Sequence, residues 1–218
     1  MNTENESLQE LRHIKQMMER STRFSSLSGF SGIAAGICAL GGIWLVVKKI
    51  NLWREINLEH LDAPKDNLAT DLLLIAISTF VAAAIFSFLF VYLRCKKLNI
   101  PLMGMSARRV VINMAIPLLA GSLFILRLAT TGNYLMIPPA CLIFYGLALV
   151  NASKYTLEEI RYLGLLEIII GVINLWLLGH GLTFWAVGFG LLHILYGIII
   201  WWKYEKNGIQ KAGTITND

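Results

Sequence analysis

Six long apolar stretches, separated by short polar connections, divide the chain almost from end to end. They cover residues 30–47, 72–93, 110–126, 135–150, 163–178 and 182–202. Each is close to the length that a helix needs to cross the hydrocarbon layer of a bilayer, which is about 30 Å thick. Lipid cannot form hydrogen bonds with bare peptide groups, so stretches this long and apolar are typical of membrane-spanning helices. The pattern therefore predicts an all-α fold, a polytopic membrane bundle of six transmembrane helices.

The composition supports one membrane-embedded domain between two polar ends. Hydrophobic residues make up 56% of the chain and charged residues 15%, and the mean hydropathy is +0.61. We divide the 218 residues into a leader (1–25), a six-helix transmembrane domain (26–204) and a polar tail (205–218). In the leader, Ser7 and Glu10 have capping-box spacing, and apolar residues recur at helical intervals from Leu8 to Met18. This predicts an amphipathic helix on the membrane surface, with pairing to a partner helix as the alternative.

Basic residues are distributed unequally between the two sets of connections. If the N-terminus is cytoplasmic, 14 of the 19 Lys and Arg residues fall on the cytoplasmic side and 5 on the far side. The cytoplasmic residues are Arg12, Lys15, Arg20, Arg23, Arg94, Lys96, Lys97, Arg108, Arg109, Lys154, Arg161, Lys203, Lys206 and Lys211. Basic residues near the ends of spans are retained on the cytoplasmic side. Both termini are therefore predicted to be cytoplasmic, and the net charge of +5 reflects topology rather than nucleic-acid binding.

Small residues recur at alternating steps of four and three on three of the predicted helices. They are Ser25, Gly29, Gly32 and Gly36 on the first, Gly164 and Gly171 on the fifth, and Gly190 and Gly197 on the sixth. Helices in lipid associate through close backbone approach, which residues this small permit. We predict that these faces pack against one another as a helix-packing seam.

The fifth and sixth helices also carry polar residues at membrane depth: Glu167 and Asn174 on the fifth, and His193 on the sixth. A hairpin that turns near residues 179–183 sets Glu167 opposite His193. An ionisable group within a span needs a partner, water or neutralisation, which makes it a functional candidate. The functional interpretation is a proton-responsive or cation-binding pair. The alternative is a packing hydrogen bond, to Asn174 or to Tyr196.

A second polar group is predicted at the cytoplasmic ends of the third, fourth and fifth helices. Its members are Arg108, Arg109, Asn113, Asn151, Lys154, Glu158, Glu159 and Arg161. Such a group would suit an anionic lipid headgroup or a small solute that enters from inside. We favour the simpler interpretation, a salt-bridged polar rim at the membrane interface.

The stretch Tyr145–Gly164, YGLALVNASKYTLEEIRYLG, and the stretch RFSSLSGFSGIAAG from Arg23 resemble an uncharacterised group of small six-span bacterial membrane proteins. The resemblance covers most of the chain and implies no activity, ligand or site. We place the protein in the inner (cytoplasmic) membrane as a multi-pass protein. The sequence contains no Walker loop, HExxH, GxSxG, paired acidic metal motif or dinucleotide fingerprint, so no catalytic residue, cofactor or metal is predicted.

Two classes of function fit these patterns. We favour a membrane interaction or sensory protein that uses its leader and basic cytoplasmic face to engage membrane lipids or a protein partner. The alternative is a small-solute or proton-coupled transporter or channel subunit, working as a homo-oligomer, with a polar path near Glu167 and His193. A water-accessible cavity at this pair would favour transport, and a dry contact would favour the interaction or sensory role.

The distribution of basic residues predicts which connections face outward. Reporter fusions placed after Asp62, Thr131 and His180 should all report the non-cytoplasmic side, because these positions lie in the three connections assigned to the far side. A fusion after Lys97 is the cytoplasmic control. A strong cytoplasmic signal from all three test fusions would overturn this topology.

Overall fold

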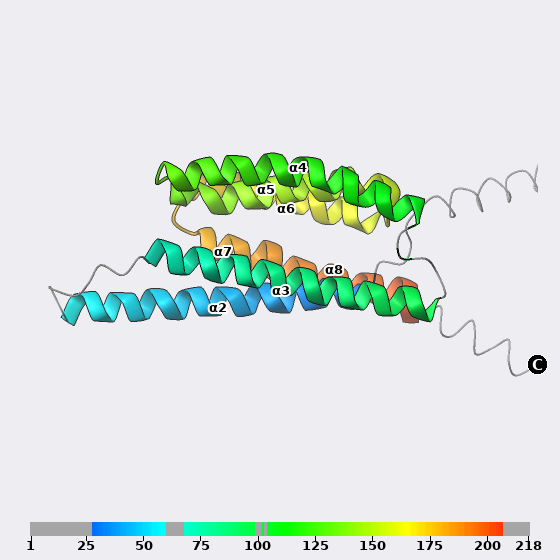
Figure 1. The fold of residues 1–218 in the computed structure, drawn as a ribbon, viewed down its shortest axis with the longest axis horizontal. Helices are drawn as coiled ribbons and strands as arrows, with labels where there is room; N and C mark the ends of the chain where they lie inside the picture. The colour runs from blue at the N-terminus through cyan, green and yellow to red at the C-terminus, as the bar shows by residue number, and fades with distance from the viewer. Residues whose placement is uncertain (1–27, 60–67, 99–101, 103, 207–218) are drawn as a thin grey trace, which may run out of the picture.

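The computed structural model describes residues 28–59, 68–98, 102 and 104–206 of the chain. The predicted leader helix, Ser25 of the predicted seam and the tail from residue 207 lie outside these residues. Five continuous helices precede a composite last helix (Figure 1). The five are α2 (Gly29–Glu59), α3 (Leu68–Lys97), α4 (Met105–Thr130), α5 (Ile137–Ala152) and α6 (Glu159–Trp176).

The last helix is assembled from four consecutive segments. They are α7 (Gly181–Trp185), the π-helical η3 (Ala186–Leu192), α8 (His193–Ile200) and the π-helical η4 (Trp201–Lys206). Short 3-10 turns flank α5, namely η1 (Tyr134–Met136) before it and η2 (Ser153–Tyr155) after it. A π-helical insertion inside an α-helix is rare, and where one occurs it is often at a functional site. The segment η3 is therefore a place to look for such a site.

The all-α architecture and the six helices agree with the prediction. Five of the helices are long and apolar enough to cross a membrane: α2, α3, α4, α5 with its flanking turns, and the last helix. The exception is α6, because its 18 residues include Glu159, Arg161 and Glu167. The first helix continues to Glu59, well beyond the expected end at residue 47. A change from apolar to polar residues ends the apolar span without ending the helix, since charged residues are good helix formers.

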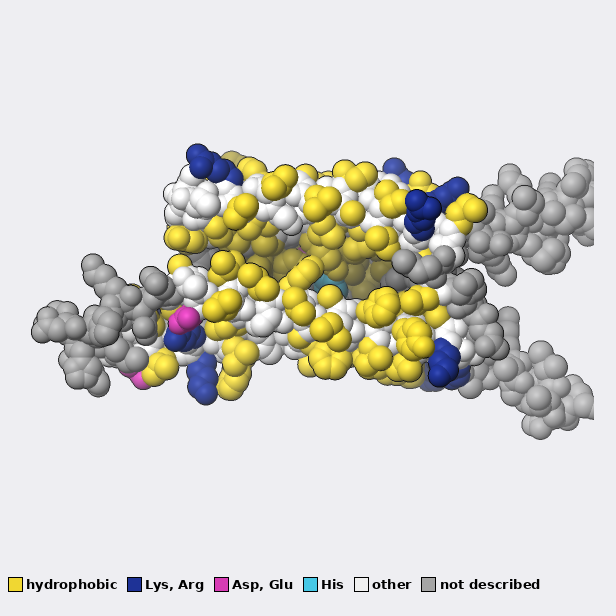
Figure 2. Space-filling view, viewed as in Figure 1, with side chains coloured by type: hydrophobic (Ala, Val, Ile, Leu, Met, Phe, Trp, Pro, Cys, Tyr) yellow, Lys and Arg dark blue, Asp and Glu magenta, His cyan; other side chains and the backbone are white. Residues whose placement is uncertain are grey.

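The helices form two layers of three (Figure 1). One layer contains α4, α5 and α6, and the other contains α2, α3 and the last helix. The layers meet where α5 and α6 contact the last helix. Large apolar side chains cover the outer surface between charged ends (Figure 2). An apolar belt between two charged ends is the surface that a bilayer requires.

Glycines make the closest contact between α2 and the last helix. A Cβ atom added at Gly32 would lie 3.1 Å from the Cα of Gly197, and one added at Gly36 would lie 2.7 Å from the carbonyl oxygen of Gly190. The small-residue faces of the first and sixth predicted helices therefore pack against each other, with their backbones in direct contact. This is the geometry by which helices associate in lipid.

The small-residue face of α6 has a different partner. A Cβ atom added at Gly164 would lie 2.7 Å from the carbonyl oxygen of Gly146, and Gly171 faces Leu142 and Ile143. These partners all belong to α5, so the α6 face packs within its own layer rather than in one seam with α2 and the last helix. The short connection between α5 and α6 makes them antiparallel neighbours, which is the physical reason for the difference.

Gly36 and Gly41 provide a matched test of the glycine contact. A methyl group at Gly36 would lie 2.6 Å from Cγ1 of Ile194, whereas one at Gly41 would have no atom of the described chain within 4 Å. We expect Gly36→Ala to cost about 1–3 kcal/mol by forcing the helices apart, and Gly41→Ala to be neutral or slightly stabilising. Thermal unfolding in detergent measures both variants, and equal melting temperatures would contradict the proposed contact.

Candidate functional site, a buried polar centre between the layers

A polar centre lies where α5, α6 and α8 meet between the two layers. The Oε1 atom of Glu167, on α6, lies 3.4 Å from the imidazole Nδ1 of His193, at the start of α8. Tyr145 of α5 contacts the other side of the ring, with its hydroxyl oxygen 2.8 Å from Nε2. Glu167 is fully buried and His193 is 6% exposed. The structure thus brings together the pair that the sequence placed at one depth, and it adds Tyr145, which no spacing in the sequence connects to them.

The hydrogen bonds of His193 assign the proton of its neutral ring. Nδ1 lies 3.1 Å from the carbonyl oxygen of Gly188, which can only accept, so Nδ1 is the donor. Nε2 of the neutral ring then accepts from the hydroxyl of Tyr145. The Nδ1 proton is therefore directed to Gly188, and the carboxyl group of Glu167 lies beside this bond without taking part in it.

Gly188, within η3, makes room for the carboxyl group of Glu167. A Cβ atom added at this position would lie 2.5 Å from Oε2 of Glu167 and 2.5 Å from Cδ2 of Leu142. Leu142 is itself fully buried. The carboxyl group therefore lies against bare backbone and an apolar side chain, and any larger residue at 188 would displace the carboxyl group of Glu167 or the side chain of Leu142.

Five buried side-chain atoms in the described part of the chain have no hydrogen-bond partner. They are both carboxyl oxygens of Glu167, both amide atoms of Asn174 and the indole nitrogen of Trp185. Each unmade bond of this kind costs about 1–3 kcal/mol, and buried polar groups rarely lack a partner. Asn174 lies two helical turns from Glu167 and does not hydrogen-bond to it, contrary to one of the alternatives that the sequence left open. Unpartnered atoms concentrated on α6 and α7 distinguish this region from ordinary helix packing.

The chemistry of the centre suits a proton better than a metal ion. Within the described ranges, no group of three or more His, Cys, Asp or Glu side chains could hold a metal. Two surface pockets, one beside Trp44 and Lys48 and one beside Pro117 and Lys154, do not reach the pair. The space-filling view shows a hollow between the layers with a histidine side chain inside it (Figure 2). Two titratable groups in direct proximity, with little exposure, form a contact that protonation can alter.

The residues of the predicted cytoplasmic rim form several separate contacts. The Nδ2 atom of Asn151 donates a hydrogen bond of 2.8 Å to the carbonyl oxygen of Asn113. Pro117 lies four residues beyond Asn113 and has no N–H to satisfy that carbonyl within the helix, so Asn151 replaces the missing donor. Arg109 lies 5.9 Å from the ring centre of Tyr155, a cation–π distance. These contacts join α4 to the end of α5 and to η2.

Glu159 belongs to a different contact from the rest of the predicted rim. Its carboxylate accepts a 2.5 Å hydrogen bond from Nζ of Lys203 and a 3.1 Å hydrogen bond from the hydroxyl of Tyr204. Glu159 therefore joins α6 to η4, through two residues that the sequence-based grouping did not include. The remaining members of the predicted rim are exposed, namely Arg108, Lys154, Glu158 and Arg161.

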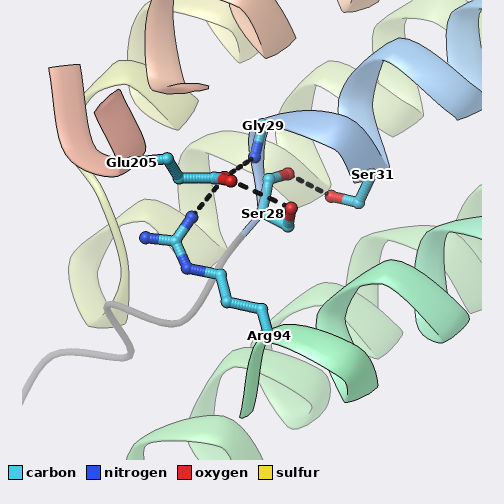
Figure 3. A network of polar contacts seen from close by, with 5 residues as sticks. All are labelled: Ser28, Gly29, Ser31, Arg94 and Glu205. Atoms are coloured by element: carbon cyan, nitrogen blue, oxygen red, sulfur yellow. Dashed lines mark hydrogen bonds and ion pairs between the residues drawn. The ribbon is translucent and has the colours of Figure 1, made fainter. Parts of the chain in front are cut away.

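A further polar cluster, the end clamp, consists of Ser28, Gly29, Arg94 and Glu205 (Figure 3). Oε1 of Glu205, in η4, lies 2.5 Å from Nη1 of Arg94 on α3. The same oxygen accepts hydrogen bonds from the backbone N–H of Gly29 at 2.7 Å and from the hydroxyl of Ser28 at 3.2 Å. The carboxylate thus caps the first turn of α2 and pairs with α3. Ser28 and Glu205 are 177 positions apart, so local sequence spacing carries no signal for this cluster.

Comparisons with known proteins do not place the chain in a family. No family model, no curated protein and no solved structure matches it. The geometry of the polar centre is therefore the basis for assigning it a role.

Removing the charge of Glu205 tests the end clamp. Glu205→Gln keeps the shape of the side chain but removes the ion pair with Arg94 and weakens the cap on Gly29, so we expect a loss of roughly 1–3 kcal/mol in stability. Glu55→Gln, at an exposed position of α2, is the matched control. Chemical or thermal unfolding in lipid nanodiscs measures both, and equal stability of the two variants would show that the clamp contributes nothing.

Proposed function

We propose that this protein is a six-span sensory protein of the cytoplasmic membrane, and that the Glu167–His193 pair is its proton-responsive element. Two contacts support an even number of spans. The backbone N–H of Gly29 donates a hydrogen bond to Glu205 at one end of the bundle. The start of the first helix and the end of the last helix therefore lie on the same side. The helix α6 packs along α5 at glycine contact, which is the position of a sixth span despite its charged residues.

The observation that carries the proposal is the burial of the Glu167 carboxyl group, 3.4 Å from His193, between two layers of helices. An uncompensated charge in this position is costly, because full burial of Glu167 removes the solvation that a charged carboxylate has in bulk water. The pair is neutral overall with one proton on the acid, or with a carboxylate beside an imidazolium. Gaining or losing one further proton leaves a net charge between the layers.

Protonation therefore acts on the contact between the layers. The titratable groups that meet at this point are Glu167 from α6, His193 from α8 and Tyr145 from α5. A net charge among them favours a wetter, more separated arrangement of the layers, and the neutral pair favours the closed one. The buried contact between Glu167 and His193 fits a sensory role, in which the response is a change in packing.

The basic end of the bundle is the surface through which such a change would act on lipid or a partner. Nine Lys and Arg residues of the described chain lie at the end of the bundle that carries the end clamp: Arg94, Lys96, Lys97, Arg108, Arg109, Lys154, Arg161, Lys203 and Lys206. Of the acidic residues at that end, Glu159 and Glu205 are already ion-paired. The excess positive charge suits an anionic leaflet or an acidic protein partner on the cytoplasmic side.

Transport is the second candidate, and one observation favours it. The unpartnered atoms of Asn174 and Trp185 continue the polar character of the centre along α6 and α7. In a proton-coupled transporter the same pair would bind and release a proton during each cycle.

The pH dependence of thermal stability tests the sensing pair. The wild-type melting temperature should fall toward alkaline pH, where a lone carboxylate is left between the layers, and toward acid pH, where a lone imidazolium is left. Glu167→Gln should lose the alkaline fall, by about 5 °C or more relative to wild type, and keep the acid one. The melting temperatures of wild type, Glu167→Gln and the control Glu55→Gln are measured across this pH range in lipid nanodiscs. Superimposable alkaline limbs for wild type and Glu167→Gln would refute the pair as a sensor.

A further inference from the structure

We propose that Asn174 and Trp185 line a one-sided hydrogen-bonding route, along which water carries protons to Glu167 from the end of the bundle opposite the end clamp. The inference rests on the proposed function, because it supplies the path by which the sensing pair exchanges its proton.

The unpartnered atoms extend away from the pair in one direction. Asn174 follows Glu167 by seven residues, which places it on the same face of α6 and about 10 Å farther along the axis. On the last helix, Phe189 lies between Trp185 and His193, with ring centroids 5.7 Å from the first and 6.1 Å from the second. Because α6 and the last helix are antiparallel, Asn174 and Trp185 both lie toward the same end of the bundle.

Asn174 is close to the surface at that end although its side chain is buried. The helix α6 ends at Trp176, and residues 175–180 are all exposed. Asn174 itself is 1% exposed, with neither amide atom hydrogen-bonded within the described chain. A buried amide in this position, with two donors and an acceptor to satisfy, is suited to hold water that enters from the nearby surface.

Apolar side chains close the other side of Glu167. Toward the end clamp, the main buried hydrophobic cluster fills the space between α5, α6 and α8. Its members are Leu149, Leu157, Ile160, Leu163 and Ile200, and Met114, Leu192 and the aromatic rings of Tyr145, Tyr196 and Tyr204 pack against it. Gly164 also contacts the backbone of Gly146 there. Water occupies sites with several polar partners and leaves apolar ones dry, so this cluster places the entrance of the route at the end of the bundle where Asn174 lies.

The proton-transfer step needs no group besides water and the carboxylate. A hydronium ion at the entrance passes its excess proton along hydrogen-bonded water, and the last water donates a proton to a carboxylate oxygen of Glu167. The products are water and the carboxylic acid, and release is the reverse. Asn174 and Trp185 neither gain nor lose a proton in this step, so they are positioning residues.

Deuterium exchange at Glu167 tests the route in protein reconstituted in lipid. The infrared carbonyl band of the Glu167 acid, identified by its absence in Glu167→Gln, shifts when H2O is replaced by D2O. Asn174→Leu and Trp185→Phe should each slow this shift by about tenfold or more, because each removes a hydrogen-bonding group from the route. Asn133→Leu, at an exposed position of the same end, should exchange like wild type.

The outcomes separate the route from the proposed function. Wild-type exchange rates in both route variants would overturn the route while leaving the sensing pair intact. If Asn174→Leu fails to fold, Trp185→Phe decides the question, because it removes the indole N–H and retains an aromatic ring. A wild-type protein without a titrating carboxylic acid band would instead refute the sensing pair itself.

Thiol labelling tests the side from which the route opens. In a variant with the three native cysteines replaced by serine, Asn174→Cys should react with a membrane-impermeant thiol reagent added on the side opposite the end clamp. Leu163→Cys, within the apolar cluster, should not react from either side. Reaction of Asn174→Cys from the clamp side only, or from neither side, would overturn the one-sided route.

Discussion

Backbone contact through glycine is the constraint on which the two layers of this bundle depend. Apolar side chains gain little by leaving lipid for a protein interior, so helices in a membrane associate through close packing and polar contacts. One layer is joined where Gly36 approaches Gly190, and the other where Gly146 approaches Gly164. With the helices this close, side chains at neighbouring positions have fixed surroundings, which sets the geometry of the polar centre.

The contact between the layers is of another kind. Gly188 leaves space for the carboxyl group of Glu167, and Tyr145 reaches across from α5 to the ring of His193. A glycine contact has the same strength at every pH, whereas a contact between an acid and an imidazole depends on how many protons the two groups hold. The layers are therefore internally fixed and joined by an element that protonation can change. This difference is the physical argument for a sensory role.

The two ends of the bundle have different character. The end clamp, with Glu205 and Arg94, and the ion pair of Glu159 with Lys203 hold one end together beside an apolar cluster. At the opposite end α6 stops at Trp176, and the connection to α7 turns at Gly179, whose φ of 99° is readily adopted by glycine alone. The buried amide of Asn174 lies near that end. The polar centre thus has a buried hydrophobic cluster toward one end and an unpartnered amide toward the other, and the proposed one-sided route rests on this difference.

The sequence alone determined the number of helices, their apolar parts and their small faces, because the length of an apolar run and the spacing of glycines are local properties. It also placed Glu167 opposite His193, since a short hairpin fixes the depth of residues on two antiparallel helices. Only the tertiary structure decided which face meets which: the stripe on α6 packs on α5, and Tyr145 completes the polar centre. Likewise the end clamp joins Ser28 to a residue 177 positions away. Periodicity defines the face of a helix, but the neighbour of that face depends on how all six helices pack together, which no local pattern encodes.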